Sequence, residues 1–123
     1  MSARSGRVKG GGGMHEIAYF EIAGPDVEKL ASFYSRVFGW TPAPGPFPAY
    51  LSLAEGAGAG LPGGFRQDAP DRVLYIRVPD LQAALDAAVR EGARVLIPPT
   101  RVPGVVHFAL FEDPAGNRTG LVQ

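Results

Sequence analysis

The sequence predicts an α+β domain in which a strand, a helix and three further strands follow one another twice. Three observations support this fold class. A faint internal repeat relates residues 17–40 to a later stretch, so that Phe20 matches Leu74 and Asp26 matches Asp80. Apolar residues alternate before each Pro-Asp pair and follow a helical period after it. Prolines and glycines divide the remaining apolar runs into short strands.

Residues 14–22 are predicted to form the first strand. Successive side chains of a strand point to opposite faces, so Tyr19 and Glu21 share one face, while Phe20 and Ile22 share the other. We expect the apolar face to pack on the helices. The mixed face is expected to line a cavity or to meet solvent.

Each strand of the repeat is followed by a predicted helix. Asp26 is placed to cap the first helix by accepting free backbone N–H groups, and Gly39 to end it in the left-handed conformation. Asp80 and Gly92 have the same roles in the second copy. The apolar residues that follow a helical period here are Val27, Leu30, Ala31, Tyr34, Val37 and Phe38. Phe33 and Tyr34 are expected to pack in the core between helix and sheet.

The remaining strands are predicted to be short. Closely spaced prolines limit residues 40–47 to a short edge strand and a loop. Pro98 and Pro99 are expected to end a strand that starts at Arg94. Residues 113–117, with the sequence DPAGN, are predicted to form a turn. The other predicted strands cover residues 49–54, 60–65, 72–78, 105–111 and 118–122.

Composition limits the class of protein. A chain of 123 residues is the size of one domain. Lys plus Arg and Asp plus Glu number 12 each, so no net field attracts nucleic acid, and the absence of cysteine excludes disulfides and thiolate ligands. No apolar run approaches the roughly 20 residues of a membrane helix. We expect a cytoplasmic protein with a flexible tail, residues 1–13, that is not a secretory signal.

Two stretches carry a resemblance to a known family. FEIAGPDVEKLASFYSRVFGW resembles the opening unit of the vicinal oxygen chelate superfamily, and FEDPAGNRTGLVQ resembles its closing hairpin. That superfamily includes glyoxalase I, extradiol dioxygenases, bleomycin-binding resistance proteins and fosfomycin-modifying enzymes. The resemblance implies a single domain over residues 14–123, with modules at about 14–66 and 72–123 forming a curved mixed sheet around a cleft. It also implies a small-molecule ligand and a homodimer.

The resemblance further implies a set of metal-ligand positions. In the metalloenzymes of the superfamily, one divalent ion is held by His, Gln and Glu side chains. The matching positions here are Tyr19, Val73 and Gly120, and the fourth falls within residues 60–65, which contain neither an acid nor an imidazole. Valine and glycine offer no donor atom, and a lone phenol is a poor ligand at neutral pH. We therefore predict neither a standard metal site nor another cofactor.

Glu21 and His107 are the candidate catalytic residues. A carboxylate in the cleft could act as a general base or recognise a substrate amine. Alternatively, Glu21 forms an ion pair with Arg77 or Arg118. His107 lies on an inner strand and could face either way. The candidate ligand-binding residues are Tyr19, Glu21, Trp40, Tyr50, Tyr75, Arg77, His107 and Arg118.

The leading functional hypothesis is a glyoxalase-like protein that binds a small organic ligand without a standard metal. One alternative is a divalent-metal-dependent lyase, isomerase or dioxygenase with unorthodox ligands such as Glu21 and His107. A second is a bleomycin-type drug-binding resistance protein, which the neutral charge of the chain disfavours. The sequence leaves open whether the protein is an enzyme.

Overall fold

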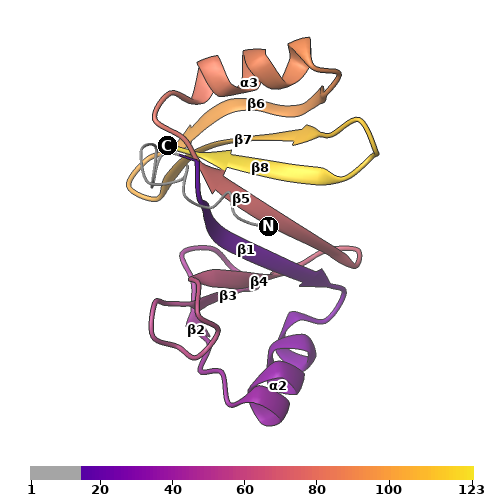
Figure 1. The fold of residues 1–123 in the computed structure, drawn as a ribbon. Coiled ribbons are helices and arrows are strands. Elements are labelled where there is room, and N and C mark those ends of the chain that lie inside the picture. The colour runs from indigo at the N-terminus through magenta and orange to yellow at the C-terminus, as the bar shows by residue number, and fades with distance from the viewer. Residues whose placement is uncertain (1–14) are drawn as a thin grey trace, which may run out of the picture. The chain divides into compact units, whose positions relative to one another are not determined.

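The computed structural model describes residues 15–123, and the tail predicted for residues 1–13 lies outside the described residues. The chain divides into two compact units (Figure 1). The first comprises residues 18–74, and the second comprises residues 15–17 and 75–123. The predicted α+β class and the twofold βαβββ order are confirmed. The elements are β1 (Ile17–Gly24), α2 (Val27–Phe38), β2 (Ala43–Pro44), β3 (Tyr50–Leu53), β4 (Gly63–Gln67), β5 (Asp71–Arg77), α3 (Leu81–Arg90), β6 (Arg94–Val102), β7 (Val106–Glu112) and β8 (Arg118–Val122).

The strands of the first unit are ordered β2-β3-β4-β1. Neighbouring strands run antiparallel except for β1 and β4, which run parallel with Glu21 opposite Gly64. The α2 helix packs on β3 and β4 (Figure 1). Its buried side chains meet the sheet in a core formed by Ile22, Val27, Ala31, Leu53, Ala57 and Phe65.

The burial predicted for α2 is only partly right. Leu30 and Tyr34 pack against the core as expected. Phe33 is 52% exposed, so its prediction as a core residue is wrong. Val37 and Phe38, which follow the apolar period of the helix, are 55% and 60% exposed. An apolar period identifies a face of a helix, but here that face is wider than the sheet it packs on.

Both helices begin where the sequence predicts, and α2 ends at its predicted Gly39, while α3 has Glu91 as its C-cap and Gly92, with a φ of +103°, follows it. The Asp26 and Asp80 carboxylates accept hydrogen bonds from the backbone N–H groups of Lys29 and Ala83, at 3.1 and 3.0 Å. At the other end of α2, Gly39 has a φ of +75° and its N–H donates to the Ser35 carbonyl. These caps satisfy backbone groups that a helix cannot satisfy internally.

The second unit has the strand order β5-β8-β7-β6, with α3 packed on β6, β7 and β8 (Figure 1). The prediction that Pro98 and Pro99 end a strand is wrong, because β6 runs through both prolines to Val102. Its register with β7 shifts between Val95 and Ile97 and again between Ile97 and Thr100. An edge strand with such irregularities tolerates residues that lack an N–H donor. The buried core of this unit is formed by Val78, Leu81, Leu85, Ala109 and Leu121.

The turn predicted before β8 is confirmed. The Asp113 carboxylate accepts hydrogen bonds from the backbone N–H groups of Ala115 and Asn117, at 2.9 and 2.8 Å, and Gly116 has a φ of +95°. The bonds to Asn117 hold the pKa of Asp113 below its usual value. This turn fixes where β8 begins.

Replacement of either helix cap should destabilise the protein. Asp26→Ala and Asp80→Ala each leave a first-turn N–H without its acceptor, which costs about 0.5–2 kcal/mol. Chemical denaturation measures the change in the free energy of unfolding. Asp26→Asn and Asp80→Asn are the controls, since asparagine caps as well as aspartate. Equal stability of the alanine and asparagine variants would contradict this account of the caps.

Candidate functional site

A hydrogen-bonded network of side chains lies on the mixed face of β1. The Tyr50 hydroxyl donates to Glu21 Oε2 at 2.8 Å, and the Tyr19 hydroxyl lies 2.6 Å from the Tyr50 hydroxyl. Arg66 Nε lies 3.4 Å from Glu21 Oε1, and the same guanidinium bonds Asp68 at 2.5 Å. Three strands of the first unit, β1, β3 and β4, therefore contribute to one polar cluster.

Strand register explains why these residues meet. Tyr19 and Glu21 are two apart on β1 and so share a face. Tyr50 is the cross-strand partner of Arg66, and Glu21 is the partner of Gly64. The parallel pairing of β1 with β4 thus places the carboxylate beside the strand that carries its guanidinium partner.

The hydrogen bonds from Tyr19 through Tyr50 to Glu21 run in one direction, from donor to acceptor. A phenol has one hydrogen, and that of Tyr50 is committed to Glu21, so Tyr19 is the donor in the contact between the two hydroxyls. Burial raises the pKa of Tyr50, and the negative charge of Glu21 raises it further. Burial and the charge of Glu21 also raise the pKa of Tyr19, against the opposing effect of its bond to Tyr50. Both phenols are therefore neutral donors at neutral pH.

Glycine makes room for the Tyr50 ring. A Cβ atom on Gly64 would lie 2.2 Å from the Tyr50 hydroxyl oxygen and 2.4 Å from its Cζ, far inside normal contact. The ring therefore occupies the space that any larger residue at position 64 would need. The second unit repeats this arrangement, because a Cβ atom on Gly120 would lie 2.1 Å from Tyr75 Cδ2.

The residues at the superfamily's metal-ligand positions do not fit a metal. Gly120 lacks a side chain and the Tyr75 ring fills the space over it, while Val73 is apolar and 2% exposed. The Tyr19 hydroxyl is hydrogen-bonded to the Tyr50 hydroxyl. Within residues 15–123, no group of three or more His, Asp or Glu side chains is arranged to hold a metal ion. The donor set required for a hard or borderline cation is not provided at these positions.

The other predicted site residues are divided between two regions. Trp40 lies away from the network, stacked on Tyr34 with ring centroids 5.3 Å apart. In the second unit, Arg118 is the cross-strand partner of Glu112, and the His107 ring lies beside Arg101, with Nδ1 and Nη2 3.5 Å apart. The positive charge of the neighbouring guanidinium disfavours the binding of a metal cation to this imidazole. Arg77 is exposed and its backbone N–H donates to the Glu16 carbonyl.

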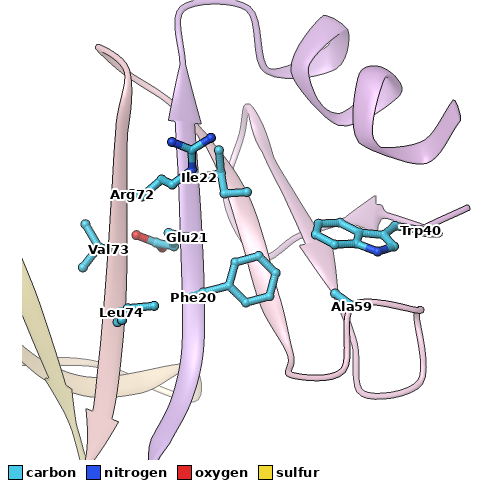
Figure 2. Close-up of a pocket in the computed structure, with 8 residues that line it drawn as sticks. All are labelled: Phe20, Glu21, Ile22, Trp40, Ala59, Arg72, Val73 and Leu74. Atoms are coloured by element: carbon cyan, nitrogen blue, oxygen red, sulfur yellow. The ribbon is translucent and has the colours of Figure 1, made fainter. Parts of the chain in front are cut away.

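A pocket of about 270 Å³ lies on the opposite face of β1 from the network (Figure 2). Phe20 and Ile22 point toward Trp40, while the Glu21 carboxylate points away from them. The residues that line the pocket are Phe20, Glu21, Ile22, Trp40, Ala59, Arg72, Val73 and Leu74. All of them belong to the first unit.

Sequence reasoning missed Arg66, Gly64 and Arg72. Glu21 forms an ion pair, as the alternative prediction stated. The partner that the structure shows is Arg66. The predicted strands stop at residue 65 and resume at residue 72, whereas β4 continues to Gln67 and β5 begins at Asp71. The period-two extension of GGF into Arg66 was the signal that could have placed this arginine on the sheet.

Comparison with known proteins decides the family. A family model described as a glyoxalase-like domain matches residues 20–122. The chain belongs to the glyoxalase-like domain family. A glyoxylase-like domain-containing protein of Didymella fabae is 32% identical over 113 residues, covering 83% of this chain and 88% of its relative. This match confirms the resemblance to the vicinal oxygen chelate superfamily, of which glyoxalase-like proteins are part.

Two further similarities are to a biosynthesis protein and to a solved structure. The anthracycline biosynthesis protein DnrV of Streptomyces peucetius is 28% identical over 119 residues, and the match covers 80% of this chain but only 43% of that protein. A methylmalonyl-CoA epimerase of Streptomyces coelicolor has a TM-score of 0.60 at 18% identity, covering 89% of this chain and 96% of the epimerase. At this identity the second similarity shows the fold alone.

The stability of the glyoxalase-like domain should fall at high pH because of Tyr19 and Tyr50. Their raised pKa values mean that the folded state holds these protons more tightly than the unfolded chain does. This stabilisation is fully present below about pH 10, the ordinary tyrosine pKa, and is lost as the pH rises above it. Chemical denaturation between pH 8 and pH 11 should show the decline. Above about pH 10, Tyr50→Phe should make the free energy of unfolding fall less steeply, by about 1.4 kcal/mol per pH unit. Tyr34→Phe, which keeps both network phenols, should not change this dependence on pH.

Filling the space over Gly120 should destabilise the second unit. Gly120→Ala forces its methyl group into the Tyr75 ring, at a cost of about 1–3 kcal/mol. In a Tyr75→Ala background the same change should cost less, because the colliding ring is gone. A double-mutant cycle of unfolding free energies measures this coupling. Strictly additive effects would show that the ring does not occupy this space.

Proposed function

We propose that this glyoxalase-like protein binds a small organic molecule at the network of Tyr19, Tyr50, Glu21 and Arg66, without the metal that the superfamily's metalloenzymes use. The observation that carries the proposal is the directed chain of hydrogen bonds from Tyr19 through Tyr50 to Glu21. It places two neutral phenols and a carboxylate side by side on one face of β1. We assign no reaction to the network.

The chemistry of the network supports a ligand with both donors and acceptors. Hydroxyl and carboxylate oxygens accept more than one hydrogen bond, so Tyr19 and Glu21 suit a ligand hydroxyl or amine. The Arg66 guanidinium suits a ligand carbonyl or phenolate. The side chain of Glu21 is 12% exposed and that of Arg66 is 27% exposed, so the network is more accessible at Arg66 than at Glu21.

The ligand class that we propose is a flat, hydroxylated aromatic molecule. Tyr19 is partly exposed and presents a ring as well as a hydroxyl, and such rings favour contact with planar apolar surfaces. The similarity to a protein of anthracycline biosynthesis supports the same class.

The homodimer and the cytoplasmic location stay predictions. Analytical ultracentrifugation measures whether the protein is a dimer. Of the helices within residues 15–123, none has the length and apolar character needed to span a membrane.

Calorimetric titration of chelator-treated protein tests the proposal. Alizarin, a dihydroxyanthraquinone, should bind saturably, and anthraquinone, which lacks the hydroxyls, should bind more weakly. Tyr50→Phe removes the central hydroxyl and interrupts the chain, so it should weaken alizarin binding about tenfold, or ~1.4 kcal/mol. It should have little effect on anthraquinone.

Tyr34→Phe is the matched control, since it removes a phenol that lies outside the network. Absence of saturable binding would reject the proposal, as would equal loss of alizarin affinity in the two phenylalanine variants. Elemental analysis of protein purified without chelator tests the metal-free part. Near-stoichiometric bound metal would contradict it and would favour the metal-dependent alternative.

A further inference from the structure

We infer that the pocket on the opposite face of β1 is a second binding site, which takes a small aromatic carboxylic acid with its ring against Trp40 and its carboxylate on Arg72. This inference is independent of the proposed function, because the two sites use different faces of β1. It depends on the shape of the pocket, on the fixed position of Trp40 and on the charge of Arg72.

Most of the residues that line the pocket are apolar. Phe20 and Ile22 come from β1, Leu74 comes from β5, and Trp40 and Ala59 come from the segments that follow α2 and β3 (Figure 2). Leu74 is 50% exposed, although its counterpart in the repeat, Phe20, packs against the core. A volume of about 270 Å³ is slightly below that of pockets for drug-sized ligands, which begin at about 300 Å³. A single-ring ligand matches this size.

Trp40 is held as a rigid wall. Its ring stacks on Tyr34 at a centroid distance of 5.3 Å and an interplanar angle of 17°, and it meets Phe20 edge-on at 5.9 Å. Gly58 lets the chain pass close to the indole, since a Cβ atom there would lie 3.2 Å from Trp40 Cδ1. A ring fixed in this way loses little conformational freedom when a ligand binds.

Arg72 supplies the polar group of the pocket. It is exposed, and its Nη2 donates to the Tyr34 hydroxyl at 3.3 Å, which ties the guanidinium to the aromatic cluster around Trp40. The ion pairs formed within residues 15–123 do not include Arg72. The carboxylate of Glu21, on the same stretch of β1, points to the other face and is engaged by Tyr50 and Arg66. An arginine beside an apolar pocket matches a ligand that joins an apolar ring to a carboxylate.

Fluorescence titration with para-nitrobenzoate tests the inference. Trp40 is the single tryptophan of the chain, so its emission reports on this pocket directly. We expect saturable quenching by para-nitrobenzoate and at least tenfold weaker quenching by the neutral para-nitrobenzamide. Arg72→Met should weaken the binding of the acid at least tenfold and leave the amide unchanged. Arg72→Lys, which keeps the charge without the planar fork, should lie between the wild type and Arg72→Met.

Two controls separate this site from the network and from a general charge effect. Arg36→Met removes an exposed arginine of α2 that bonds Ser32 and does not line the pocket, and it should not change the binding of either probe. Tyr50→Phe should also leave para-nitrobenzoate binding unchanged, so failure of one site does not imply failure of the other. Equal affinity for the acid and the amide, unsaturable quenching, or an Arg72→Met variant that binds like the wild type would overturn the inference.

Discussion

The close approach of a tyrosine ring to a strand glycine is the constraint on which the candidate site depends. Tyr50 covers Gly64 in the first unit and Tyr75 covers Gly120 in the second. Each ring lies so close to its glycine that a Cβ atom there would overlap the ring. A side chain at either glycine would displace the ring, and in the first unit it would break the contact that brings the Tyr50 hydroxyl to Glu21. The phenols are thus accommodated by the absence of a side chain on the neighbouring strand.

This constraint also separates the chain from the metalloenzymes of its superfamily. Where their last strand offers a carboxylate, Gly120 offers none, and the space over it holds an aromatic ring. Glu21, which is a strand neighbour of the first ligand position, is instead engaged by Tyr50 and Arg66. One fold therefore supports a different site chemistry through a few exchanges of side-chain volume and charge, as expected when function resides in sites carried by a fold.

The two faces of β1 have different chemistry because its side chains alternate. Tyr19 and Glu21 join a polar cluster whose phenols are kept neutral by burial. Phe20 and Ile22 join an apolar surface that is completed by Trp40 and the exposed Leu74. A strand of eight residues thus provides both a hydrogen-bonding surface and an apolar pocket. Neither face interferes with the other, since the sheet separates them.

The sequence by itself determined what depends on local chemistry. Period-two alternation located β1 and divided its faces, and Asp26, Gly39 and the turn at Asp113 marked where elements begin and end, because caps and turns involve residues close in the chain. The tertiary structure decided what depends on register and on packing between distant strands. The pairing of Arg66 with Glu21, the continuation of β6 through its prolines and the exposure of part of α2 are of this kind. The fitting of each tyrosine over its glycine is another, because such contacts join residues whose separation in sequence carries no periodic signal.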